Sequence, residues 1–500
     1  MSMLRCTSRA PLATGFGLAV SLATLLGVAG CGEENKAPEP ETWAEEWNVL
    51  LVTLDTTRAD RLGCYGREGA STPNLDALAE DGVRFETAIS TAGITPMSHA
   101  SILTGRNNYS HGLRVFFGDL GHRLPAGVPS LPELLRERGW HTAGFVSSYP
   151  VSQAYGLARG YQTFHTGLED TLGTLDLSRQ QRHSSTWEDG PRNNTQRRAD
   201  ETVDDALTWL EEHGDQGPWH VWLHVFDVHD FSLVPPQTFA EERGVTYDPS
   251  VSSKDVAVRD SMYDFELAYV DQQIGRVLQY LRETGQYERT LIVVTADHGQ
   301  GLTDGVRDHG WMLHRLLYEW SIRVPLLLKL PEAAEGQQVG VVVPELVRTI
   351  DILPTVLEAL DLAPPVGVEG RSVLPILRGA LDEPRLAYAD ALNLEDAHSP
   401  GPRLPAGQND NLYAVRDQRW KLIHHARAPQ SSELYDLQTD PRELNNVYAE
   451  HPAEVARLRR FLDERDAFRL VPKGESGAAP DAGALNALGY TGDEDEDEEE

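Results

Sequence analysis

Four short apolar segments in the first 300 residues constrain the fold of this chain most strongly. They are rich in aliphatic and aromatic residues and cover residues 48–55, 141–147, 219–227 and 290–297. Continuous apolar runs of this length are typical of strands that are covered on both faces, as in a parallel sheet. Helical patterns separate them. The sequence therefore predicts an α/β fold with a mainly parallel central sheet and helices on both faces.

The helices expected between these strands have clear starts or apolar faces. One covers residues 131–138 behind a capping box made by Ser130 and Glu133, one covers residues 198–213, and a long one ends near Gly285.

The composition changes after Ala380. Short apolar runs, separated by turn residues, recur there around residues 387–390, 412–415, 420–424 and 433–437. A helical pattern follows over residues 452–465. We therefore predict a small C-terminal subdomain over residues 381–470, made of an antiparallel sheet and one helix.

The N-terminus has the composition of a bacterial export signal. Arg5 and Arg9 precede an apolar run that ends in Val28-Ala29-Gly30-Cys31, which resembles a lipobox. We predict a lipoprotein signal peptide over residues 1–31, with Cys31 lipidated as the first residue of the mature chain. An ordinary N-terminal anchor helix is the alternative.

Both ends of the mature chain are expected to lack a packed core. Residues 32–46, rich in Glu and Pro, predict a flexible tether. Residues 471–500 predict a tail that is acidic and disordered at its end, since residues 493–500 are all acidic. The protein would then be exported and lipid-anchored to a bacterial membrane, on the periplasmic face or the cell surface.

The formal net charge of the chain is -33. Such a charge argues against nucleic acid as a partner, because a polyanion would be repelled. The sequence leaves the oligomeric state open.

Three of the four predicted strands end in an aspartate: Asp55, Asp227 and Asp297. In an open α/β sheet, ligands bind beyond the carboxyl ends of the strands, so three carboxylates there would converge on one site. A lone aspartate after a strand more often caps a turn or a helix. Here His229 lies two residues past Asp227 and His298 directly follows Asp297, which favours metal binding.

The segment from Thr95 to Arg106 reads TPMSHASILTGR. It resembles the nucleophile loop and helix start of the sulfatase family, within the alkaline phosphatase superfamily. Further segments that resemble this family, in order and spacing, are residues 54–66 (LDTTRADRLGCYG), 111–114 (HGLR), 351–355 (DILPT), 369–372 (EGRS) and 433–437 (ELYDL). The resemblance implies a sulfatase-like catalytic domain over residues 47–380 and a sulfate or phosphate ester of a small molecule, glycan or lipid as substrate.

The resemblance also implies a divalent metal ion. In the family, the aspartate after the first strand, the nucleophile and an Asp-His or Asp-Asn pair before a glycine contact the ion, which places ligands at Asp55, Thr95, Asp297 and His298. Many sulfatases have two adjacent aspartates after the first strand, but Thr56 follows Asp55 here. This departure favours manganese or zinc over the calcium that is common in sulfatases. A ligand shell with one fewer carboxylate is more similar to that of the phosphoethanolamine transferases, lipoteichoic acid synthases and nucleotide phosphodiesterases of the superfamily.

Position 95 is a further departure, because sulfatases usually have a cysteine or serine there that matures to formylglycine. A formylglycine hydrate releases sulfate by collapsing to the aldehyde, which Thr95 cannot do. A phospho-threonine intermediate can instead be resolved by water or by an acceptor alcohol. The sequence thus predicts a metal-dependent hydrolase of sulfate or phosphate esters with Thr95 as nucleophile. A phosphodiesterase or phosphotransferase, and a catalytically silent binding lipoprotein, are the alternatives. Thr95 could also be the N-cap of its helix.

Four further residues are candidates for the catalytic machinery. His99 is expected to hydrogen-bond the nucleophile or a substrate oxygen, or to have an ordinary capping role. Arg58 and Arg106 could neutralise the charge of a tetrahedral anion or form structural salt bridges. His229 resembles the family histidine on the leaving-group side, and the ordinary pKa of histidine suits a general acid at neutral pH.

A second metal site is an alternative role for part of this set. Asp227, His229 and His314 could form it, as in two-metal phosphodiesterases, and His309 could replace His314. His220 and His224 alternate along a predicted strand and are expected to be packed core residues.

Overall fold

A computed structural model gives the structure of residues 47–470, apart from residues 119, 169–195, 230–232, 246–255, 312, 335, 397–398 and 400–402. The predicted signal peptide with Cys31, the tether and the acidic tail lie outside these described residues. Within the described part, the structure contains no helix that is both long and apolar enough to span a membrane.

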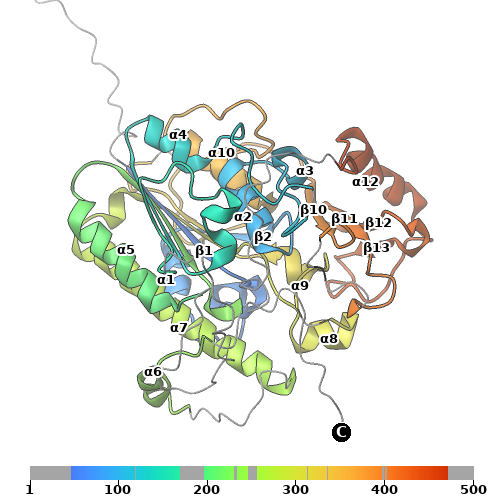
Figure 1. The fold of residues 1–500 in the computed structure, drawn as a ribbon, viewed down its shortest axis with the longest axis horizontal. Helices are drawn as coiled ribbons and strands as arrows, with labels where there is room; N and C mark the ends of the chain where they lie inside the picture. Colours follow the sequence, from blue (N-terminus) through green and yellow to red (C-terminus); the bar gives the residue numbers. More distant parts are fainter. Residues whose placement is uncertain are drawn as a thin grey trace, which may run out of the picture. The chain divides into compact units, whose positions relative to one another are not determined.

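The centre of the structure is a nine-stranded sheet with the order β4-β3-β5-β1-β6-β8-β2-β7, in which β9 pairs with β2 (Figure 1). The strands are β1 (Asn48–Leu54), β2 (Val83–Ile89), β3 (His141–Val146), β4 (Thr163–His165), β5 (Trp219–Val225), β6 (Thr290–Thr295), β7 (Arg323–Val324), β8 (Leu326–Lys329) and β9 (Val341–Arg348). Strands β4, β3, β5, β1 and β6 are parallel neighbours, whereas β8 runs antiparallel to β6. The mainly parallel sheet and its four predicted strands are confirmed.

Strand β1 shows why the sheet is covered on both faces. All of its residues are buried. Val49 and Leu51 belong to one apolar core, whereas Leu50, Val52 and Leu54 belong to another. Successive side chains of a strand point to opposite faces, so these two cores lie on the two sides of the sheet.

Helices supply the rest of both cores. One core contains residues of α2 (Thr95–Thr104), α4 (Leu131–Glu137) and α10 (Ile352–Ala359). The other contains residues of α1 (Pro73–Asp81), α5 (Ala199–His213) and α7 (Val256–Glu283), and Figure 1 shows α5 and α7 running along one face. The predicted capping box of α4 is present. Shorter helices are α3 (Asn108–His111), α6 (Gln237–Glu242), α8 (Thr303–His309), α9 (Glu319–Ile322) and α11 (Leu374–Leu377).

A small antiparallel sheet follows, as predicted. Its strands, in sheet order, are β10 (Ala387–Leu392), β11 (Asn411–Arg416), β12 (Trp420–His425) and β13 (Glu433–Asp436). Helix α12 (Pro452–Glu464) buries Leu458 and Leu462 in a core with Leu422 and Leu434 of this sheet. Residues of β10 to β12 also share a core with residues 316–322, so the sheet is packed against the preceding part of the chain. The boundary at residues 380 and 381 stays a prediction.

The order of the strands positions the polar residues that follow them. Strands β5, β1 and β6 are neighbours, with Leu54 paired to Val225 and Thr53 paired to Thr295. The carboxyl ends of these three parallel strands therefore lie at one edge of the sheet, where Asp55, Asp227 and Asp297 follow them.

Candidate active site

A cluster of predicted metal ligands lies at this edge. The ligand atoms of Asp55, Asp297 and His298 all lie within 4.8 Å of one another, and all three residues are fully buried. The structure thus brings together three of the four ligands that the family resemblance implied.

The charge of the cluster fits a cation. Asp55 Oδ1 and Asp297 Oδ2 are buried without a hydrogen-bond partner in the described part of the chain. Burial, and next the charge of Asp297, raise the pKa of Asp55 well above its ordinary value. Two carboxylates that repel each other in a dry site are stabilised by a positive ion between them, and oxygen and imidazole ligands suit manganese or zinc.

Thr95, the fourth predicted ligand, contacts this cluster. Its Oγ1 lies 3.2 Å from His298 Nε2. His298 Nδ1 donates to Gly299 O at 2.9 Å, since a carbonyl oxygen can only accept. In the neutral ring, Nε2 therefore presents its lone pair, which can accept the proton of the Thr95 hydroxyl or bind a metal.

Helix α2 presents Thr95 from its first residue. Its N-cap is Ile94, so the alternative of an N-cap role for Thr95 is wrong. All ten residues of α2 are buried, which fixes the helix inside the protein. Its N-terminal end, where backbone N–H groups favour an anion, faces the site that contains Thr95.

His99 supports the nucleophile by a hydrogen bond to the backbone carbonyl oxygen of Thr95 and not to the Thr95 hydroxyl. His99 Nδ1 donates to Thr95 O at 2.8 Å, and Nε2 accepts from Thr53 Oγ1 at 3.1 Å. Burial lowers the pKa of His99 to about 3, so its ring is neutral at neutral pH. Of the two predicted roles, this geometry favours the ordinary capping role at the end of the helix over a hydrogen bond to the nucleophile hydroxyl or a substrate oxygen.

His224 has a role that the sequence did not indicate. It is a buried strand residue, as predicted, but its Nε2 donates to Asp55 Oδ2 at 3.1 Å. Ser147 N donates to His224 Nδ1 at 3.4 Å, which leaves the ring proton on Nε2. A histidine near the carboxyl end of a strand beside the metal-ligand strand is the signal that could have identified it.

The turn after Asp55 is held in a strained conformation. Thr56 has a φ of 49°, which is rare for a β-branched residue. In this conformation Thr56 N donates to Asp297 Oδ1 at 3.1 Å. Tyr263 of α7 fixes the turn, because its hydroxyl donates to Thr56 O at 2.7 Å and accepts from Arg58 N at 2.8 Å.

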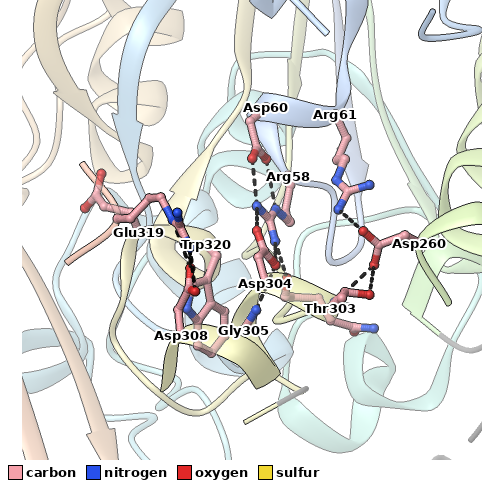
Figure 2. Close-up of polar contacts among 12 residues, drawn as sticks. Arg58, Asp60, Arg61, Asp260, Thr303, Asp304, Gly305, Asp308, Glu319 and Trp320 are labelled. Atoms are coloured by element: carbon pink, nitrogen blue, oxygen red, sulfur yellow. Dashed lines mark hydrogen bonds and ion pairs between the residues drawn. The ribbon is translucent and has the colours of Figure 1, made fainter. Parts of the chain in front are cut away.

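Arg58 lies in a network of salt bridges (Figure 2). Its five N–H donors serve both oxygens of Asp60, both oxygens of Asp304 and Gln300 O. No donor of Arg58 remains for a substrate oxygen, so of its two predicted roles the structure has the structural salt bridge. The network joins the turn after β1 to the segment after β6, and these two segments carry Asp55 and Asp297.

The loop that carries His298 also lies close to the backbone of α9, which explains Gly299. A Cβ atom at Gly299 would lie 2.2 Å from Trp320 O and 3.1 Å from Arg58 Cγ. A larger residue at position 299 would therefore collide with the backbone at Trp320 and displace this loop. Figure 2 also shows Arg61 paired with Asp260 of α7, beside the network of Arg58.

Arg106 does not contribute to the site. It follows the C-terminal end of α2, and Thr95 begins that helix, so the two are separated by about 15 Å along the axis. Arg106 Nη2 donates to Val366 O at 2.7 Å. The prediction that Arg106 neutralises a bound anion is wrong for this reason.

Two further histidines lie beside His298. The ring centroid of His314 is 4.7 Å from that of His298 and 5.3 Å from that of His229. Burial lowers the pKa of His229 and of His314 well below the ordinary value. The expectation of an ordinary pKa for His229 is therefore wrong, and its ring is neutral at neutral pH before substrate binds.

The predicted second metal site is not assembled as tightly as the first. Among the described residues, the ligand atoms of Asp227, His229 and His314 do not gather within 4.8 Å. Asp227 Oδ1 accepts from Ala199 N, the first residue of α5, at 3.1 Å, and burial raises the pKa of Asp227 to about 7. His309 lies elsewhere, stacked on Tyr318. The second site stays a prediction.

Comparisons with known proteins identify the family of the chain. The model of the sulfatase family matches residues 47–362, and that of the N-sulphoglucosamine sulphohydrolase C-terminal region matches residues 307–466. The chain belongs to the sulfatase family. It is an ester hydrolase of this family, and the family resemblance of its sequence motifs is confirmed.

Individual relatives of this sulfatase-family protein are distant but cover most of it. An N-acetylglucosamine-6-O-sulfatase of Bacteroides thetaiotaomicron is 23% identical over 88% of each chain. An arylsulfatase of Clostridium perfringens is 26% identical over 83% of this chain and 93% of its own.

Solved structures show the same fold. A phosphonate monoester hydrolase of Agrobacterium radiobacter superposes with a TM-score of 0.66 at 22% identity, covering 84% of this chain and 96% of its own. A protein solved in complex with its substrate D-glucosamine-2-N,6-O-disulfate gives a TM-score of 0.64 at 22% identity, covering 86% and 100%.

The salt-bridge role of Arg58 predicts a loss of stability on substitution. Arg58→Met should lower the free energy of unfolding by about 2 to 3 kcal/mol, because buried partners lose their counter-charge. The matched control Arg67→Met, at a side chain 42% exposed, should change it by less than about 1 kcal/mol. Urea denaturation measures both. Equal midpoints for the two variants, with activity lost in Arg58→Met alone, would instead indicate that Arg58 contacts the substrate.

Proposed function

We propose that this protein hydrolyses sulfate or phosphate esters with Thr95 as its nucleophile and a divalent ion held by Asp55, Asp297 and His298. The contact between Thr95 Oγ1 and His298 Nε2, inside a buried cluster with an excess of negative charge, carries this proposal. The ion would be manganese, zinc or calcium, with the first two favoured by the ligand set. When bound, it would neutralise the charge of the ester oxygens and favour the alkoxide form of the nucleophile.

The reaction then has two steps. In the first, Thr95 Oγ1 forms a bond to phosphorus or sulfur, the bond to the leaving oxygen breaks, and the hydroxyl proton ends on the leaving alcohol. In the second, water attacks the phosphorylated or sulfated threonine, the bond to Oγ1 breaks, and Thr95 regains a proton.

The side chains around Thr95 position these groups. His229 donates an N–H hydrogen bond to the leaving oxygen from a neutral ring. A bound anion would raise the pKa of His229, because an adjacent negative charge favours the protonated ring. His224 and the Thr56 amide hold the two carboxylates in place from behind.

The nucleophile supports phosphate-type esters most directly. A threonine ester is resolved by attack at phosphorus, whereas sulfatases that use formylglycine release sulfate without a second attack at sulfur. The fold similarity to a phosphonate monoester hydrolase is compatible with this choice, and the sulfatase relatives support sulfate esters. In a phosphodiesterase the ester that Thr95 attacks is a diester and water resolves the intermediate, whereas in a phosphotransferase an acceptor alcohol replaces water in the second step. The intact ligand cluster argues against a catalytically silent binding protein.

Substitution of Thr95 tests the nucleophile. Thr95→Ala should lower kcat/KM by about a thousandfold or more, and Thr95→Ser should keep measurable activity, because only the first variant lacks a hydroxyl. The matched control is Ser98→Ala in the same helix. Within the described part of the chain, the Ser98 hydroxyl bonds only the carbonyl oxygens of Ile94 and Thr95. Nitrophenyl sulfate, nitrophenyl phosphate and bis-nitrophenyl phosphate should be assayed side by side with manganese or zinc.

The pattern across substrates and variants separates the outcomes. Activity of Thr95→Ala equal to that of the unmodified protein would contradict the nucleophile. Greater activity on the phosphodiester than on the sulfate would select the phosphate form of the proposal, and the reverse would select the sulfate form.

We also propose that the protein is exported and anchored in a bacterial membrane by lipid on Cys31, as the lipobox-like sequence indicates. In a bacterial host, the full chain should incorporate labelled palmitate and sediment with membranes. Cys31→Ser should abolish both, and Cys64→Ser should change neither. Labelling that survives Cys31→Ser would contradict the anchor.

A further inference from the structure

Arg315 is a buried arginine beside the proposed active site, with part of its hydrogen-bonding capacity unused. Its side chain is 4% exposed. Nη1 donates to Asp396 Oδ2 at 2.9 Å, whereas Nη2 is buried with no hydrogen-bond partner in the described part of the chain. A buried charged donor without an acceptor is unfavourable, so it points to a ligand that would accept from it.

The backbone at Arg315 is strained. Its φ of 89° is in the left-handed region, which a long side chain rarely adopts. The loop that precedes Thr95 packs closely on this turn, because a Cβ atom at Gly93 would lie 3.2 Å from Arg315 N. Strain of this kind is kept where the surrounding structure fixes a residue for function.

The position of Arg315 next to the histidines brings its positive charge close to the site. It follows His314, whose Nδ1 donates to Gly93 O at 2.8 Å and whose ring lies beside His298. Arg315 is therefore one residue away from the imidazole next to the metal-ligand cluster.

Asp396 holds the guanidinium in one orientation. It lies in the turn after β10, and its carboxylate accepts from Phe116 N at 3.2 Å and from Phe117 N at 3.3 Å. Three segments that are distant in sequence thus meet at Asp396. Asn393, in the same turn as Asp396, also has both amide atoms buried without a partner in the described part of the chain. This turn therefore combines a fixed positive charge with unused amide groups.

We propose that Arg315 binds a second anionic group of the substrate, a carboxylate or a further sulfate on the same sugar, beside the ester that Thr95 attacks. An arginine donor that is already oriented by a carboxylate binds such an oxygen with little loss of freedom. The substrate would then be an ester of an acidic or multiply sulfated sugar. This inference rests on the proposed function, since it places the ester at Thr95.

Binding to a protein that cannot turn over the ester tests the proposal. The full chain with Thr95→Ala, supplied with manganese, should be titrated by calorimetry with two matched pairs of sugars. One pair is glucosamine 6-sulfate and glucosamine-2-N,6-O-disulfate, and the other is 2-O-sulfated glucuronate and its methyl ester. In at least one pair, the sugar with the second anion should bind about tenfold more tightly, and the pair that responds identifies the group as sulfate or carboxylate.

Added variants separate recognition from folding. Adding Arg315→Gln should reduce the ratio of affinities within the responding pair to about one, and Arg315→Lys should keep part of it, because the charge remains. Combining Arg315→Gln with Asp396→Asn avoids a buried carboxylate that has lost its counter-charge and should give the same ratio as Arg315→Gln alone. The matched control is Arg276→Gln, at a surface salt bridge 41% exposed, which should leave the ratio unchanged.

Each outcome decides the proposal. Equal affinities within both pairs, no binding of any sugar, or a ratio that survives Arg315→Gln would overturn the role of Arg315. Failure of the proposed function would be seen differently, as no hydrolysis by the chain with Thr95 intact while the difference in affinity persists.

Discussion

The structure around the site depends on the repulsion between two buried carboxylates, Asp55 and Asp297. Each follows one of two neighbouring parallel strands, so the sheet itself brings them together. Burial and this repulsion raise the pKa of Asp55, and neutral donors contact both carboxylates, among them the Thr56 amide, the His298 amide and the His224 ring. Such donors orient carboxylates without cancelling their charge. A bound divalent ion would cancel it, and the Thr95 hydroxyl lies beside the same imidazole that would bind that ion.

Rigidity around this pair comes from a second group of interactions farther out. Arg58 joins the segments after β1 and β6, Tyr263 fixes the strained turn at Thr56, and helix α2 is buried along its whole length. Arg58 and Tyr263 stabilise the site in this way without contacting a substrate. A shift of the two ligand segments would separate the carboxylates and relieve the repulsion without any ion, so the network preserves a site that is unfavourable when empty of positive charge.

The sequence predicted much of this arrangement, because apolar runs ending in aspartate indicate both the strands and the edge at which ligands gather. Asp55, Asp297 and His298 were identified in this way, and the family resemblance added Thr95. The roles of Arg58, Arg106 and His224 could not be predicted equally well, since they depend on partners that are distant in the chain. Arg58 meets Asp304, Arg106 meets the carbonyl of Val366, and His224 meets Asp55. The same reason applies to Arg315, whose partner Asp396 lies in the turn after β10. The pKa of His229 was mispredicted because burial, which lowers it, is not visible in a single sequence.

Anomalous X-ray diffraction from crystals of the full chain grown with manganese tests the central claim most directly. The account predicts an anomalous peak within coordination distance of one oxygen each of Asp55 and Asp297 and of His298 Nε2, with Thr95 Oγ1 in the same coordination shell. A peak at another group of residues, with Asp55 and Asp297 left without an ion at saturating manganese, would contradict it.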